Sequence, residues 1–364
     1  MVNNPFEVED VAEPRYIPSL HRLALLTAAA TFPLIFMGGL VTSHGAGMSV
    51  PDWPNSYGYN MFLFPPRLWV GGILYEHTHR LAGVVVGLLA IAATACAWKV
   101  EPRRWVRWLC TALLGAVILQ GVIGGLRVVL VKLDLAVVHA CFAQAFFCLA
   151  AFVAVVTSRW WIGAGSRPSD DGEGAAGRKL FRLAAVAVFS IYLQLVIGAL
   201  MRHYGAGLAI PDLPLAYGKV LPPFTEEGLR RVNDSRLFDA GLPRVTLAQV
   251  WLHFAHRVGA LVVTVHVLAA AFGALSRHRR PGLVGPAAAM LALLVTQVTL
   301  GVLTVLFRKP ADVASAHVAT GALLLVTTFV LAARAGRLYL PAPRKTRPAG
   351  AAGFDVPAAE LVTA

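Results

Sequence analysis

The sequence predicts an all-α integral membrane protein, built from eight transmembrane helices that form two tandem-duplicated four-helix bundles. Composition is the first indication, because 57% of the 364 residues are hydrophobic and only 14% are charged. A mean hydropathy of +0.66 excludes the ordinary soluble enzyme, the coiled coil and the disordered chain. The net charge of +13 does not indicate nucleic-acid binding, because the basic residues flank apolar runs instead of clustering in a polar domain.

Eight apolar segments are the second indication. A hydrocarbon core needs about 20 apolar residues per helical crossing, and each segment is long enough to supply them. The expected spans are residues 21–43, 69–98, 107–131, 135–157, 180–203, 247–275, 282–307 and 312–335.

The basic residues set the expected orientation of these spans. Of the 32 Lys and Arg residues, 19 fall on the side that carries both termini and 11 on the opposite side, while Arg80 and Arg257 lie within spans. Because cytoplasmic loops carry the excess of Lys and Arg, both termini are expected in the cytoplasm. Two long loops, residues 44–68 and 204–246, then face outward.

An internal repeat is the third indication. Residues 39–58 (GLVTSHGAGMSVPDWPNSYG) align without a gap with residues 199–218 (ALMRHYGAGLAIPDLPLAYG), and nine of the twenty positions are identical. Each copy contains four spans, an even number, so both copies run in the same direction through the membrane. The expected units are a cytoplasmic segment 1–20, a first bundle 21–157, a flexible polar linker 158–179, a second bundle 180–335 and a cytoplasmic tail 336–364.

Four histidines recur at matching positions of the two copies: His79 with His256, and His139 with His317. An ionisable residue inside the bilayer indicates function, and two facing neutral imidazoles are suitable axial ligands for a haem iron. Neither half offers the additional Cys or carboxylate ligands that a tetrahedral zinc site requires. An interhelical hydrogen bond is the alternative role for one such histidine, and the fourfold recurrence argues against it.

The neighbours of these histidines favour a flat macrocycle. Gly83 and Gly87 follow His79 on one helical face, and Gly259 follows His256, which leaves space for a planar ring against the backbone. Arg80 and Arg257 follow the histidines directly and are predicted to bind the cofactor by pairing with propionates.

One position distinguishes the two copies. Glu76 precedes His79 by three residues, where the second copy has His253. A carboxylate on the same helical face as an imidazole can exchange protons with a substrate or orient a neighbouring side chain.

The remaining polar residues of the outer side have simpler expected roles. Histidines near the span ends, His77 among them, are expected at the interface or the surface. Asp52 and Asp212 are expected to bond the local backbone of their loops, which either cover the mouths of the sites or form rigid turns.

The motifs GAGMSVPDWPNSYGYNMF and EHTHRLAGVVVG, with the later His-Arg and Gln-to-His elements, resemble the haem A synthase family over about residues 21 to 335. The resemblance implies an oxidoreductase of the bacterial inner membrane. Such an enzyme oxidises a ring methyl of haem O to the formyl group of haem A, through a hydroxylated intermediate, for cytochrome oxidase assembly.

The resemblance also implies roles for single residues. His79 and His139 would flank the substrate haem O, Glu76 would be needed for turnover, and His256 and His317 would ligate the iron of a haem b. The implied partners are haem O, haem A, the lipid bilayer, haem O synthase and cytochrome oxidase assembly factors, with no nucleic acid and with a homo-oligomer left open.

One departure from the family pattern concerns the first outer loop. Many bacterial relatives carry a cysteine pair there, whereas this chain has Val50 and Ser56. Its four cysteines all lie in or beside apolar segments, so no structural disulfide is expected.

Two other functions fit part of the pattern. A non-catalytic di-haem electron-transfer protein of the cytochrome b type would also need two bis-histidine sites, but Glu76 without a counterpart argues against it. A haem carrier would need a polar path through the midplane, and the apolar inner halves of the spans do not provide one.

Overall fold

The computed structural model describes residues 15–164, 172–238 and 240–340. Within these ranges the chain is helical and contains no β-strand. Eight helices are long: α1 (Pro18–Ser43), α2 (Gly72–Val100), α3 (Arg104–Val129), α4 (Leu133–Val156), α6 (Gly172–His203), α8 (Leu247–Arg277), α9 (Val284–Leu306) and α10 (Ala311–Tyr339). The shorter elements are α5 (Arg159–Gly163), α7 (Glu226–Phe238) and the 3-10 helices Met61–Leu63, Pro66–Leu68 and Ala206–Leu208.

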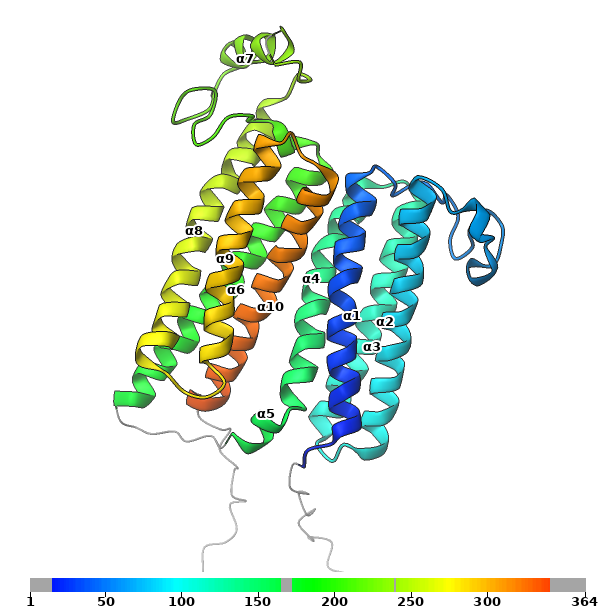
Figure 1. Cartoon of the computed structure of the whole chain (residues 1–364), viewed down its shortest axis with the longest axis vertical. Helices are drawn as coiled ribbons and strands as arrows, with labels where there is room; N and C mark the ends of the chain where they lie inside the picture. Colours follow the sequence, from blue (N-terminus) through cyan, green and yellow to red (C-terminus); the bar gives the residue numbers. More distant parts are fainter. Residues whose placement is uncertain (1–14, 165–171, 239, 341–364) are drawn as a thin grey trace, which may run out of the picture.

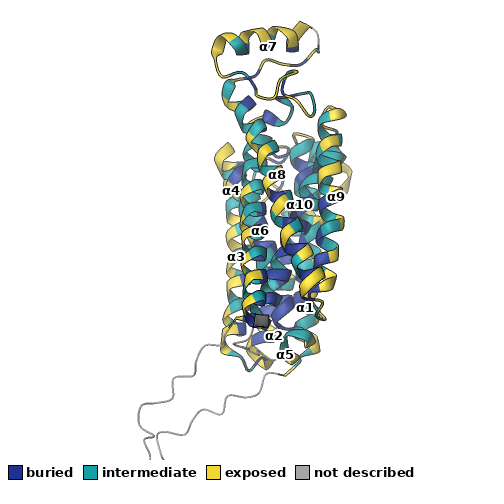
Figure 2. Cartoon of the chain, turned by 90° about the vertical axis from the view of Figure 1, so that its left-hand side faces the viewer, coloured by how far each residue is buried: buried dark blue, intermediate teal, exposed yellow. Residues whose placement is uncertain are grey.

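The eight long helices are each long and apolar enough to cross a membrane. Their outward faces are exposed (Figure 2) and carry large apolar side chains, for example Phe189, Leu261 and Val295. Such faces are unfavourable in water and favourable in lipid. The chain is therefore an all-α, multi-pass membrane protein, as the sequence predicts.

The long helices form two groups of four that stand side by side (Figure 1). In the first group α2 and α4 each contact both α1 and α3, and in the second α8 and α10 each contact both α6 and α9. In each ring of four, the second and fourth helices therefore lie diagonally opposite each other. The tandem duplication itself stays a prediction, which this recurring contact pattern supports.

Each group has an apolar core of its own. Leu20, Val86 and Leu113 are buried in the first, and Val267 and Met290 in the second. The groups meet where α10 contacts α1 and α4, and where α4 contacts α6. Two ends of the molecule follow from this packing: the outer-loop end, which carries α7, and the terminal end, where α1 begins, α10 ends and α5 lies (Figure 1).

Several predicted boundaries differ from the structure. The segment from Gly172 to Gly177, expected in a flexible linker, is the first part of α6, and α5 occupies another part of that linker. Helix α7 in the second outer loop was not expected, because its sequence has too few apolar residues to stand out. Residues 1–14, 165–171 and 341–364 of the expected N-terminal segment, linker and tail lie outside the described ranges. The domain limits stay predictions. All four cysteines are free in the structure.

Candidate functional site

The two histidines of the first half each lie against a glycine of the preceding helix. His79 of α2 packs on Gly38 of α1, where an added Cβ would lie 3.1 Å from its Cε1 atom. His139 of α4 packs on Gly124 of α3, where the corresponding distance would be 2.8 Å. Because any side chain would push these rings away, the two glycines allow each imidazole to approach a helix backbone closely.

The second half repeats this arrangement. His256 of α8 packs on Gly198 of α6, and His317 of α10 packs on Gly301 of α9, with added Cβ atoms 3.1 and 3.0 Å from the Cε1 atoms. All four histidines are half-buried, so none is enclosed in an apolar core. The sequence placed the histidines on the second and fourth spans of each copy, but it did not reveal Gly38 and Gly198, whose facing depends on how α1 and α6 are rotated.

The rings within each half lie near each other. The centroids of His256 and His317 are 6.4 Å apart, and His139 lies within electrostatic range of His79. Two imidazoles that bind one metal atom from opposite sides at about 2 Å each have centroids about 6 Å apart. The spacing of the second pair therefore fits a single metal atom held between them.

Glutamine residues contact three of the four histidines, two through their side chains and one through its backbone oxygen. Gln120 donates from Nε2 to the backbone oxygen of His139 at 3.0 Å, and Nδ1 of His317 lies 3.1 Å from the backbone oxygen of Gln297. Gln194, which sequence reasoning missed, lies with Nε2 3.0 Å from Nδ1 of His256 and donates to its backbone oxygen at 2.7 Å. His79 has Leu34 at the position that matches Gln194.

The space around the first pair differs from that around the second. An added Cβ at Gly83 or Gly87 would meet no atom within 4 Å, as expected for an open face beside His79. At Gly259, by contrast, it would lie 2.1 Å from Oε1 of Gln194. The expected open space at Gly259 is therefore wrong, because the amide that holds His256 fills it.

The donor groups in each half can be compared with those that a haem iron requires. Among the described residues no group of three or more His, Cys, Asp or Glu side chains could hold a metal ion, so the donor set in each half is two imidazoles. Nδ1 of His79 and Nδ1 of His139 are buried without a hydrogen-bond partner. Paired imidazoles in both halves, together with the open glycine faces of the first half, fit axial ligation of a haem iron.

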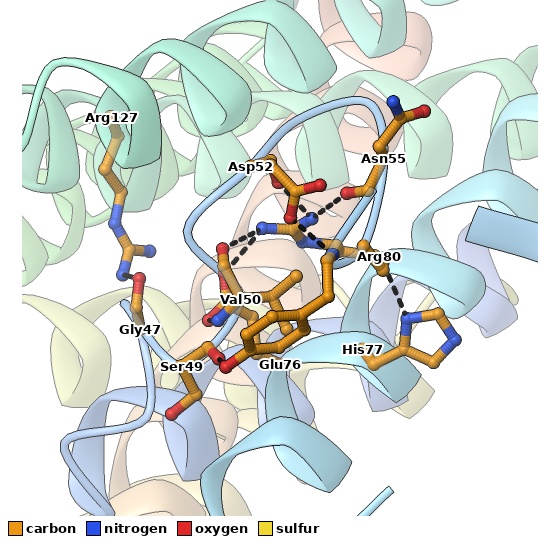
Figure 3. Close-up of polar contacts among 11 residues, drawn as sticks. Gly47, Ser49, Val50, Asp52, Asn55, Glu76, His77, Arg80 and Arg127 are labelled. Atoms are coloured by element: carbon orange, nitrogen blue, oxygen red, sulfur yellow. Dashed lines mark hydrogen bonds and ion pairs between the residues drawn. The ribbon is translucent and has the colours of Figure 1, made fainter. Parts of the chain in front are cut away.

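Arg80 anchors the first outer loop to α2 (Figure 3). Its Nη1 donates to the carbonyl oxygens of Asp52 and Asn55 at 2.7 and 3.0 Å, and its Nη2 donates to that of Val50 at 2.7 Å. Nη2 also pairs with Oε1 of Glu76 at 2.8 Å. Both terminal nitrogens are thus used within the protein, and the predicted pairing of Arg80 with a propionate has no support from these contacts.

Glu76 is 4% exposed and completes this anchor. Its second oxygen, Oε2, accepts a hydrogen bond from the backbone N–H of Val50 at 2.9 Å. Glu76 therefore ties the loop to the helix turn that carries His79, three residues further along.

Asp52 closes the loop on itself, as expected. Its two oxygens accept hydrogen bonds from the backbone N–H groups of Tyr57 at 2.7 Å and Gly58 at 2.8 Å. Burial would raise the pKa of Asp52, but these backbone donors outweigh it and hold the pKa below its usual value.

The second outer loop is anchored in the same way. Asp212 accepts from the N–H groups of Tyr217 and Gly218 at 2.8 and 2.9 Å. Arg257 donates to the carbonyl oxygens of Leu215 and Ile210 at 2.9 and 2.8 Å.

The position of Glu76 is occupied by a different kind of residue in this second anchor. There His253 accepts the hydrogen bond from the N–H of Ile210, at 3.2 Å from its Nδ1. An imidazole thus replaces the carboxylate, and Arg257 has no close ion pair that matches the one between Arg80 and Glu76.

His77 lies in a different environment from the one expected. It was expected at the interface or surface, yet it is fully buried, because the first loop folds back over the start of α2. Its Nδ1 lies 3.2 Å from the hydroxyl oxygen of Ser56, and the rings of Phe64 and Trp69 pack against it at 5.0 and 4.6 Å between centroids.

Two further arginines lie near the histidine pairs at the outer-loop end. Arg127 of α3 donates to the carbonyl oxygen of Gly47 at 2.9 Å (Figure 3). Arg202 of α6 reaches across to the first half and donates to the carbonyl oxygen of Gly39 and the hydroxyl of Ser43, both at 2.5 Å. Arg202 therefore joins the two halves beside their sites.

The fold and site define a multi-pass membrane protein with a pair of facing histidines in each half. The family model described as "Cytochrome oxidase assembly protein", COX15-CtaA, matches residues 71–329. The chain belongs to this family.

Similar proteins of known name agree with this assignment. The chain is 28% identical to "Heme A synthase" of Symbiobacterium thermophilum over 78% of this chain and 85% of that protein. It is 27% identical to "Heme A synthase" of Geobacillus kaustophilus over 82% and 86% of the two chains. It is also 27% identical to "Heme A synthase" of Methylorubrum populi over 92% and 89%.

Proposed function

We propose that the chain is a haem A synthase of the bacterial inner membrane, with both termini in the cytoplasm. It would oxidise a ring methyl of haem O to the formyl group of haem A for cytochrome oxidase. The observation that supports this proposal is the pair of imidazoles in each half, each ring packed against a glycine of the preceding helix. The chain's membership of the COX15-CtaA family supports it as well.

The surroundings of the two pairs support different roles for them. His79 and His139 would hold the substrate haem, because the first half has the open glycine faces and the carboxylate of Glu76. His256 and His317 would hold a resident haem b, because Gln194 fixes the His256 ring more tightly than Leu34 can fix that of His79. The bound porphyrin and its iron would supply the redox chemistry.

Glu76 is the acid or base candidate. Its two oxygens accept hydrogen bonds from Arg80 and Val50, and each retains a second lone pair that can accept a proton. The loop anchored at the same carboxylate would keep water away from the mouth of the first site. Excluding water strengthens the electrostatic interactions inside the site, those of the Glu76 carboxylate among them.

The second candidate, a di-haem electron-transfer protein, would use both histidine pairs without a reaction. Glu76 opposite His253 disfavours it, since two purely electron-carrying sites have no need of a buried carboxylate in one half only. Haem O synthase and cytochrome oxidase assembly factors remain proposed partners, and a homo-oligomer stays a prediction.

Pigment analysis separates the two functions. Membranes that contain this chain and a source of haem O are expected to accumulate haem A, measured by pigment extraction and mass spectrometry. A haem-loaded protein that leaves haem O unchanged would contradict the enzyme and favour the electron-transfer protein.

A further inference from the structure

A pocket of about 370 Å³ opens at the terminal end of the molecule, where the two halves meet. Arg159 and Trp160 of α5 line one side, Arg280 and Pro281 between α8 and α9 line another, and Leu338 of α10 adds an apolar wall. No carboxylate is among the described residues that line it. The pocket therefore combines two positive charges with an apolar surface at the level where the spans end.

Trp160 fixes the geometry of this pocket. Its indole Nε1 donates to the carbonyl oxygen of Pro281 at 3.1 Å, and its ring lies against Gly282, where an added Cβ would come within 2.3 Å. Arg334 of α10 stacks on the same ring at 5.0 Å and donates to the carbonyl oxygen of Gly282 at 2.8 Å. Helix α5 is thus held against the α8–α9 turn, and the pocket between them is a built feature.

Arginine and aromatic residues are paired around this whole end. Every cation–π pair found in the described ranges lies in or next to the terminal ends of the spans: Arg103 with Trp105, Arg107 with Trp98, Arg159 with Tyr16, Arg280 with Tyr339, Arg334 with Trp160 and Arg337 with Trp161. Aromatic rings of this kind occupy the headgroup level of a bilayer. The pocket therefore opens into the layer where phospholipid phosphates lie.

Buried donors behind the pocket add to its positive character. The Nε atoms of Arg334 and Arg337 are buried and have no hydrogen-bond partner. A second pocket of about 410 Å³ at the α2–α3 turn has a similar basic and aromatic lining from Arg15, Lys99, Arg107 and Trp98. It also contains Glu101, whose carboxylate pairs with Arg103 at 2.7 Å.

We propose that the pocket between α5 and the α8–α9 turn binds the phosphate headgroup of an anionic phospholipid. Arg159 and Arg280 would attract the phosphate, and Leu338 and the apolar faces of the spans would accommodate the acyl chains. Basic pockets at the ends of membrane helices select anionic lipid headgroups in this way. The proposal goes beyond the proposed function and does not depend on it.

Native mass spectrometry of the full chain tests the proposal. The protein is released from detergent in the presence of phosphatidylglycerol, of phosphatidylcholine or of inorganic phosphate alone. We expect retention of phosphatidylglycerol by the wild type and a binding constant about tenfold to thirtyfold weaker in R159Q/R280Q, the loss expected for two basic residues near an anionic surface. The variant removes the stacking of Arg159 on Tyr16 and of Arg280 on Tyr339, but it keeps the contacts of Trp160 with Pro281 and Arg334.

A matched control removes the same number of charges elsewhere. Arg230 and Arg231 lie exposed on α7 at the opposite end of the molecule, and R230Q/R231Q is expected to bind phosphatidylglycerol like the wild type. Equal weakening of phosphatidylglycerol binding in both variants would overturn the proposal, because the effect would then come from the net charge of the protein and not from the pocket. Equal retention of phosphatidylcholine, or tight binding of inorganic phosphate without lipid, would also overturn it.

Discussion

The two halves of the molecule anchor their outer loops with the same contacts but place different chemistry beside their histidines. Asp52 and Asp212 close the loops, and Arg80 and Arg257 bind loop carbonyl oxygens from the second span of each half. The first half then adds the buried carboxylate of Glu76, whereas the second has His253. The scaffold and the chemistry of each site are therefore separate features, and the half with the carboxylate is the one proposed to turn over.

A second difference concerns how firmly the imidazoles are held. Gln194 bonds His256 and fills the space at Gly259, while the first half has Leu34 and open faces at Gly83 and Gly87. Gln194 restricts the orientation of the His256 ring, whereas His79 has no glutamine at the matching position. This contrast supports a resident haem in the second half and an exchanging one in the first.

The largest expected effect is the loss of the resident haem in His256→Ala. Purified protein of this variant should lose the haem b signal of its absorption spectrum, because one of the two proposed axial ligands is gone. His79→Ala should keep that signal, and His266→Ala, which removes a histidine of the same helix farther from the outer-loop end, serves as the control. If His79→Ala lost as much haem b as His256→Ala, the proposed division of roles between the halves would be wrong.

The next largest effect is expected for Glu76→Gln. The variant keeps a hydrogen-bond acceptor for the Val50 N–H but loses the carboxylate, so haem content should stay unchanged while the rate of haem A formation falls about 10²- to 10⁴-fold. His253→Gln makes the equivalent change in the second half and should keep most of the turnover. Unaltered turnover in Glu76→Gln would leave only the anchoring role for this residue.

A smaller effect, on stability, is expected to distinguish the anchor at Arg80 from the anchor at Arg257. Arg80→Gln leaves the buried Glu76 carboxylate without its partner and should destabilise the protein by about 3 kcal/mol. Arg257→Gln removes only hydrogen bonds to carbonyl oxygens and should cost about 1–2 kcal/mol. Thermal unfolding in detergent measures both.

The pairing of Arg80 with Glu76 can be checked separately. In a protein that already carries Glu76→Gln, Arg80→Gln should lower the free energy of unfolding less than it does in the wild type. The reason is that no unpaired carboxylate charge is then left behind. If Arg80→Gln lowered the free energy of unfolding equally in the wild type and in Glu76→Gln, the ion pair would not be what distinguishes the two anchors.

Much of the fold and part of the site could be predicted from the sequence. Long apolar runs determine the spans because the bilayer requires them, and the repeat identified His79 with His256 and His139 with His317 before any geometry was known. Asp52 and Asp212 were also predictable, since aspartate in a Gly- and Pro-rich turn bonds nearby backbone N–H groups. These features depend on local sequence or on periodic spacing.

The rest depends on how distant segments pack. Gln194 could not be recognised, because its repeat partner is Leu34 and no motif marks it. Arg80 looked suited to a propionate because the sequence does not reveal that a loop of the same half would present its carbonyl oxygens there. His77 was misjudged for the same reason, since only the folded loop buries it.

The position of Arg80 and Arg257 has a consequence for access to the sites. Each arginine is the residue directly after the histidine proposed to ligate iron, so one helical turn carries both the tether of the outer loop and the imidazole. A displacement that pulls the loop aside must strain that turn and move the ring nitrogen with it. On the proposed function, movement of the outer loop during entry of a haem would therefore act on the same helical turn that carries its proposed iron ligand.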